Sequence, residues 1–162
     1  ATRGYTPSVF ANLPKLLERA GTAPKGSITA FYTVLVDGDD MNEPIADTVR
    51  GILDGHIVLD RGLANRGHYP AIDVLASVSR CMKDIVPSEQ IAAAEKLKRL
   101  LSTYKSSEDL INIGVYQPGS NPEIDESLRH IQTIWNYLRQ KTNEKVNYAE
   151  ACRQLIDQFA GG

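Results

Sequence analysis

The sequence lacks the features that mark several specialised classes of protein. It has only two cysteines, Cys81 and Cys152, and their wide separation gives neither a metal-binding pair nor a disulfide framework. Basic and acidic residues nearly balance at 18 and 20, without the basic excess that binds nucleic-acid phosphates. No apolar run approaches the ~18 residues that span a membrane, and no signal-peptide pattern opens the chain. These absences favour a cytosolic protein in a reducing compartment, with no nucleic-acid partner.

Signatures of a complete active site are missing as well. The phosphate-binding loop Gly-x-x-x-x-Gly-Lys-Ser/Thr has no match, and neither do His-Glu-x-x-His or Gly-x-Ser-x-Gly. In length and composition, with 162 residues of which 42% are hydrophobic, the chain is an ordinary globular protein. It opens at Ala1 without a methionine and runs directly into structured-looking sequence, so we expect it to be part of a longer protein.

The first half of the chain alternates helical and extended patterns. A helix is predicted over 7–20 by a cap followed by proline at its start and by Gly21 as its stop, and over 43–53 by helical spacing of apolar residues. Residues 27–36 are rich in β-branched and aromatic side chains and too apolar to be one-sided, which predicts a strand buried on both faces. A second short strand covers 56–59, and a third apolar run follows Pro70. Strands separated by helices indicate an α/β fold with a largely parallel sheet.

The second half of the chain has helical patterning only. Its apolar residues recur every three or four positions, which is the period of an amphipathic helix. We therefore expect a C-terminal helical bundle, and a border that divides the chain into residues 1–86 and 87–162. The expected helices begin near Ser88, Pro122 and Tyr148, and the last ends near Phe159.

Residues near Pro70 and at the end of the third apolar run are candidates for function. A residue before proline is held extended, so Tyr69 can present its ring for stacking, although the spacing fits a core tyrosine equally well. His68 is a candidate general base, but no second titratable residue lies at a sequence spacing that would mark a catalytic pair. A packing role explains His68 more simply. Arg80 ends an apolar segment, where a guanidinium can reach phosphate oxygens or can simply be a charge at an edge.

Four acidic residues around a predicted turn suggest a cation site only weakly. Acidic side chains are favoured at turns and helix starts by the helix dipole, so a structural role explains them without a metal. We assign no metal ligand. The four residues are Asp39, Asp40, Glu43 and Asp47.

Four ordered stretches, with compatible spacing, resemble a known family over nearly the whole chain. They resemble the flagellum-specific and virulence type III export ATPases, which are relatives of the rotary F-type ATPase subunits. The resemblance implies the back half of a RecA-like core with a mostly parallel sheet, followed by an all-α C-terminal helical bundle. It also implies that the P-loop, the catalytic glutamate and the Mg²⁺-positioning aspartate precede Ala1, so that this chain alone is inactive and binds no ATP. The stretches are residues 4–10, 26–29, 52–59 and 68–75.

The resemblance implies roles for three residues. Tyr69 matches the aromatic residue that stacks on adenine, and Arg80 matches the arginine finger that reaches the nucleotide of the neighbouring subunit. Tyr148 falls near a second aromatic of the adenine pocket. Because one sequence carries both the platform and the finger, a homo-oligomer with equivalent head-to-tail interfaces is expected, which by resemblance is a hexameric ring.

The resemblance implies that the full-length protein couples the hydrolysis of ATP, bound with Mg²⁺, to type III protein export. General similarity favours the flagellar export system over the virulence system. The partners implied are export cargo, chaperones, and regulatory and stalk proteins, with membrane association only through the export apparatus. Residues 112–119 stand where catalytic F-type subunits carry a long acidic lever segment, which argues against proton-driven synthesis. Two alternatives remain: a helical module that binds cargo, chaperones or a stalk, and a non-catalytic rotary ATPase subunit.

Overall fold

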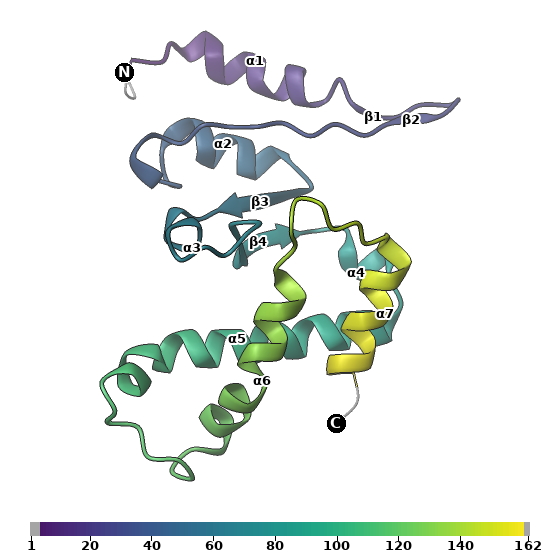
Figure 1. The fold of residues 1–162 in the computed structure, drawn as a ribbon. Coiled ribbons are helices and arrows are strands. Elements are labelled where there is room, and N and C mark those ends of the chain that lie inside the picture. The colour runs from purple at the N-terminus through teal and green to yellow at the C-terminus, as the bar shows by residue number, and fades with distance from the viewer. Residues whose placement is uncertain (1–3, 161–162) are drawn as a thin grey trace. The chain divides into compact units, whose positions relative to one another are not determined.

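The computed structural model describes residues 4–160 and divides into two compact units between His56 and Ile57. The border that the sequence predicts between residues 86 and 87 stays a prediction. Figure 1 shows the order of the elements along the chain.

The first unit contains two neighbouring helices, α1 (Pro7–Leu17) and α2 (Pro44–Ile52). Both helices carry a proline at their first position, where the missing N–H costs nothing. Leu17 of α1 is buried, and α2 buries Ala46 and Val49, which lie one turn apart. Both helices that the sequence predicts in this half are therefore confirmed. A short 3₁₀ helix, η1 (Asp37–Asp39), lies between them in sequence.

The predicted strand over residues 27–36 is wrong for most of its length. Strand β2 comprises only Ser27–Ile28, paired antiparallel with β1 (Gly21–Thr22). The chain continues without a partner strand among the described residues, and Phe31 and Leu35 are 89% and 90% exposed. An apolar run becomes a buried strand only where neighbouring strands and helices cover it. The predicted largely parallel sheet is accordingly replaced by short two-stranded sheets.

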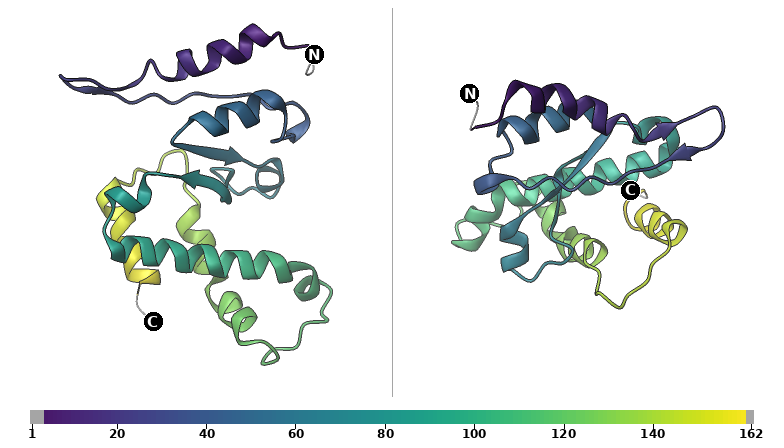
Figure 2. Two further views of the ribbon diagram at one scale, coloured as in Figure 1. Left: turned by 180° about the vertical axis from the view of Figure 1, so that it is seen from behind. Right: turned by 90° about the horizontal axis from the view of Figure 1, so that it is seen from above.

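In the second unit, strand β3, which begins at the border between the units, pairs with strand β4. A long helix follows, and two further helices pack against it (Figures 1 and 2). The predicted α/β class with a helical C-terminal part is confirmed, as are the predicted helix starts. The elements are β3 (Gly55–Leu59), α3 (Arg61–Asn65), β4 (Ile72–Ser79), α4 (Met82–Ile85), α5 (Ser88–Asn112), α6 (Pro122–Leu138) and α7 (Tyr148–Phe159).

The core of the second unit lies where α6 and α7 contact α5. Aromatic rings fill it: Tyr104 and Trp135 meet edge to face with centroids 5.4 Å apart, and Tyr137 packs against Phe159. None of the helices described between residues 4 and 160 is both long and apolar enough to cross a bilayer. The buried apolar residues are Ala93, Leu97, Leu100, Leu101, Tyr104, Ile131, Ile134, Leu155 and Phe159.

Helix α6 begins with a side-chain cap, which leads to a stability prediction. The Asn121 side-chain oxygen accepts hydrogen bonds from the backbone N–H groups of Glu123 and Ile124. Asn121→Ala removes this acceptor and is expected to lower the free energy of unfolding by about 1 kcal/mol, measured by urea denaturation. Asn136→Ala, at an exposed position of the same helix, is the control and is expected to change the stability little. Equal losses in the two variants would contradict the capping role.

Candidate functional site

The segment before β4 is shaped by helix α3 and the turn that follows it. Asp60 caps α3, since its Oδ1 accepts the Leu63 N–H at 2.7 Å. At Gly67 the backbone φ is +69°, a conformation that favours glycine, and the chain reverses so that the His68 N–H donates to the Leu63 carbonyl at 3.0 Å. This turn delivers the next residue, Tyr69, to the surface.

His68 is buried next to this turn. Burial lowers its pKa below the ordinary value of 6.5, and the positive charges of Arg139 and Lys105 lower it further. A buried imidazole whose charged form is disfavoured by burial and by two nearby cations fits the packing role better than that of a general base exposed to substrate.

Tyr69 lines a shallow hollow on the second unit. Its side chain is 57% exposed, and its backbone carbonyl accepts the Gln140 N–H at 3.0 Å, which joins the segment to the loop after α6. The hollow is open to solvent and has a volume of about 390 Å³. Its wall therefore combines one aromatic face with polar groups. The lining residues are Tyr69, Pro70, Gln140, Lys141, Thr142 and Glu144.

The loop that faces Tyr69 is closed by its own hydrogen bonds. The Lys141 N–H donates to the Glu144 carboxylate at 3.1 Å, and the Gln140 side-chain amide donates to the Glu144 carbonyl at 3.0 Å. The loop is thus a formed rim of the hollow. Sequence reasoning missed this rim, because a polar turn between two helices is an ordinary connection and carries no motif.

Arg80 and Tyr148 do not line this hollow. Arg80 is exposed and directly follows the end of β4. Tyr148 is the first residue of α7; it is 71% exposed, and its hydroxyl accepts from the Gln90 side-chain amide at 3.4 Å. Of the three residues to which the resemblance assigns a role, only Tyr69 therefore belongs to the hollow.

Three of the four acidic residues singled out in the first unit have contacts or burial that give them a structural role. Glu43 is buried at the start of α2, the Asp40 side chain accepts the Asn42 N–H, and Asp47 forms an ion pair with Arg50 at 3.0 Å. Across residues 4–160, no three histidine, cysteine or acidic side chains gather into a group that can hold a metal.

Comparison with known families accounts for most of the chain. Residues 1–79 match the ATP synthase alpha/beta family, nucleotide-binding domain, and residues 86–157 match the T3SS EscN ATPase C-terminal domain. The flagellum-specific ATP synthase of Bacillus subtilis is 60% identical over 154 residues, covering 95% of this chain. The chain belongs to the flagellar and type III secretion ATPases. It spans 35% of the length of that Bacillus subtilis relative.

Solved structures of this ATPase family have the same fold. The assembled ATPase EscN of the enteropathogenic E. coli type III secretion system superposes with a TM-score of 0.91 at 51% identity, covering 95% of this chain and 37% of EscN. EscN in complex with its central stalk EscO superposes with a TM-score of 0.84 at 50% identity, covering 95% of this chain and 36% of that one. The resemblance inferred from the four sequence stretches is thereby confirmed.

Proposed function

We propose that this chain is the C-terminal part of an ATPase that couples ATP hydrolysis to flagellar or type III protein export, and that Tyr69 stacks on the adenine of ATP. The observation that carries this is the exposed Tyr69 ring at a hollow of about 390 Å³, in a chain whose family is named for ATPases. An aromatic face binds a base by stacking, and the polar rim residues Gln140 and Glu144 offer hydrogen-bonding groups to its edge. We assign no Mg²⁺ ligand to the described residues.

Arg80 is assigned the role of an arginine finger that acts in a neighbouring subunit. Its position supports this, since Arg80 is exposed and directly follows the end of strand β4. A guanidinium placed across an interface neutralises charge on the transferred phosphoryl group only when the subunits are correctly assembled. Hydrolysis then depends on a homohexameric ring, an assembly supported by the relative EscN, which was solved in assembled form.

Further partners follow from the same assignment. A stalk protein is proposed because EscN was solved with its central stalk EscO. Export cargo, chaperones and regulatory proteins are proposed as the remaining partners, with the protein in the cytoplasm and held at the export apparatus through these contacts.

A second candidate function is a partner-binding module formed by the helices alone. Leu110, Ile113 and Val115, at the end of α5 and just after it, are exposed apolar residues of the kind that partner surfaces use. Capture of a stalk protein or of cargo–chaperone complexes by residues 87–162 would support this candidate, and absence of capture would count against it.

The adenine assignment is tested by truncating the Tyr69 ring. Tyr69→Ala in the full-length ATPase is expected to weaken ATP binding by about 1–3 kcal/mol, the contribution of base–aromatic stacking. Tyr69→Phe keeps the ring and is expected to bind as the parent does. Tyr148→Ala is expected to give a smaller loss. Titration with a fluorescent ATP analogue measures all three dissociation constants, and an unchanged constant for Tyr69→Ala would refute the assignment.

A further inference from the structure

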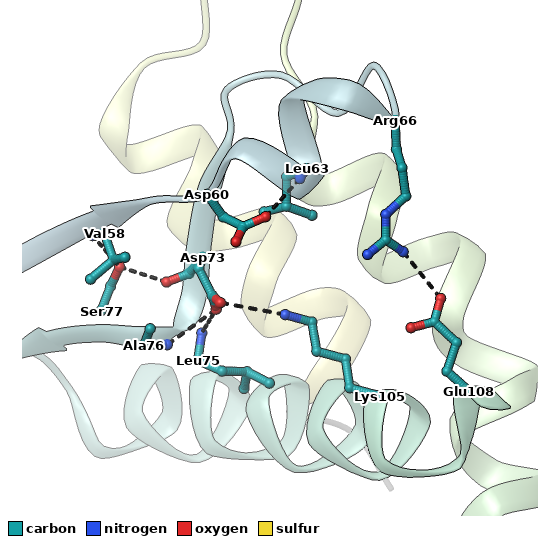
Figure 3. A network of polar contacts seen from close by, with 10 residues as sticks. All are labelled: Val58, Asp60, Leu63, Arg66, Asp73, Leu75, Ala76, Ser77, Lys105 and Glu108. Atoms are coloured by element: carbon teal, nitrogen blue, oxygen red, sulfur yellow. Dashed lines mark hydrogen bonds and ion pairs between the residues drawn. The ribbon is translucent and has the colours of Figure 1, made fainter. Parts of the chain in front are cut away.

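Two ion pairs tie the segment that carries Tyr69 to helix α5 (Figure 3). Before Tyr69, the Arg66 guanidinium lies 3.1 Å from the Glu108 carboxylate. After Tyr69, the Asp73 carboxylate lies 3.5 Å from the Lys105 ammonium group. Lys105 and Glu108 are one turn apart and therefore share a face of α5. Both ends of the Tyr69 segment are thus attached to one face of one helix.

The Asp73 end of this attachment is rigid. One oxygen of the Asp73 carboxylate accepts the backbone N–H groups of Leu75 at 3.0 Å and Ala76 at 3.1 Å, which leaves the other oxygen for Lys105. The Ser77 hydroxyl donates to the Asp73 carbonyl at 2.6 Å and accepts the Val58 N–H from β3 (Figure 3). Asp73 is therefore fixed in strand β4, and its ion pair holds α5 to a defined point of the sheet.

Between the two ion pairs, the backbone leaves Tyr69 little freedom except at its ring. The buried His68 is held by its N–H bond to the Leu63 carbonyl, and the Ala71 carbonyl accepts the Asp60 N–H at 2.8 Å. Helix α5 itself is held by the aromatic and aliphatic core that it forms with α6 and α7. The Tyr69 segment is therefore attached to α5 on both sides of Tyr69, and Tyr69 itself is attached to the loop after α6.

The pair of Arg66 and Glu108 is exposed enough that it contributes little to overall stability. The side chains of Arg66 and Glu108 are 64% and 27% exposed, and ion pairs in such positions have small effects on folding. The placement of the two ion pairs on either side of Tyr69 suits a local role, since a small shift of a stacking ring weakens its contact with a base.

We propose that Arg66, Asp73, Lys105 and Glu108 are positioning residues that fix Tyr69 on helix α5 and thereby set the affinity for the adenine base. The proposal rests on the function proposed for Tyr69. Under this proposal, helix α5 influences the affinity for nucleotide, although none of the four residues lines the hollow.

Charge reversal at the more accessible pair tests this in the full-length ATPase. Glu108→Arg places like charges beside Arg66 and is expected to raise the KM for ATP about 3- to 10-fold, with kcat at saturating ATP within about twofold. The double variant Arg66→Glu with Glu108→Arg restores the pair and is expected to return KM to within about twofold of the parent. A parental KM in Glu108→Arg, or failure of the double variant to restore it, would overturn the proposal.

A second ion pair on α5 supplies a matched control. Arg99 and Glu126 lie 3.1 Å apart, with exposures of 51% and 27%, and join α5 to α6 away from the Tyr69 segment. Glu126→Arg is expected to leave KM unchanged. If it raises KM as much as Glu108→Arg does, the effect is a general loosening of α5 and the proposal is wrong. Lys105→Met, which breaks the other pair without introducing repulsion, is expected to raise KM about 2- to 5-fold and replaces Glu108→Arg should that variant fail to fold.

Combination with Tyr69→Ala separates this proposal from the function on which it rests. If Tyr69→Ala alone leaves ATP affinity unchanged, the adenine assignment fails, and with it the basis of the positioning role. If Tyr69→Ala weakens ATP binding but Glu108→Arg does not, only the positioning role fails. Where both act, Glu108→Arg is expected to add no further loss in the Tyr69→Ala background, because its effect passes through the ring. Additive losses would overturn the proposal.

Discussion

Replacing Arg80 by alanine in the full-length ATPase is expected to abolish the oligomer-stimulated part of ATP turnover while leaving ATP affinity largely intact. An arginine finger stabilises charge that develops only in the transition state, so its loss lowers kcat, by about 10³- to 10⁵-fold in related phosphoryl-transfer enzymes, and not ground-state binding. Arg80 lies at the exposed end of β4 and outside the hollow of Tyr69. ATP turnover measured over a range of protein concentrations separates the oligomer-dependent rate from the basal rate.

Two controls sharpen the Arg80 experiment. Arg153→Ala removes an exposed arginine of α7 and is expected to leave turnover unchanged. Arg80→Lys keeps the charge but loses the planar guanidinium, and it is expected to recover only a small part of the rate. Size-exclusion chromatography with ATP present checks that the ring still assembles. Parental turnover in Arg80→Ala would show that the finger assignment is wrong.

Phe159→Ala is expected to lower the free energy of unfolding of the second unit by about 3–5 kcal/mol, because it removes a large ring from a closed core. Phe159 is 1% exposed and contacts the rings of Tyr137 and His130, which come from α6. Its loss leaves a cavity where α7 meets the other two helices. Urea denaturation followed by fluorescence measures the effect, since the single tryptophan, Trp135, lies on α6 in the same unit.

The control for Phe159 is the same substitution at an exposed phenylalanine. Phe31 is 89% exposed, so Phe31→Ala is expected to change the stability of the chain by less than about 0.5 kcal/mol. A loss for Phe159→Ala no larger than that of Phe31→Ala would mean that α7 does not contribute to the core as its packing indicates.

The helices were predictable because their periodicity is a property of short windows of sequence. Helix α7 has the bounds that its apolar spacing predicts, 148–159, and α5 begins at Ser88, next to its predicted start. The strand over 27–36 was not predictable in the same way, since burial of an apolar run depends on what lies beside it. Phe31 and Leu35 are apolar and nevertheless exposed among the described residues.

The site was predictable only in part, and for a related reason. Tyr69 was found through a stretch of sequence that resembles a family motif. The opposing rim at Gln140 and Glu144 carries no motif, because its place is set by the packing of α6 and by hydrogen bonds between segments far apart in sequence. The ion pair between Arg66 and Glu108 was also not predictable, because nothing in the sequence shows which arginine and which glutamate lie close together in the fold.

The bond between the rim and the Tyr69 segment joins two main-chain atoms, the Gln140 N–H and the Tyr69 carbonyl oxygen. Such a bond is independent of the side chain at either position, with proline at position 140 as the exception, because proline has no N–H to donate. Substitutions at position 140 other than proline can therefore change the polar groups at the hollow while its two walls stay joined. The chemistry of the hollow and the bond that closes it are thus separable.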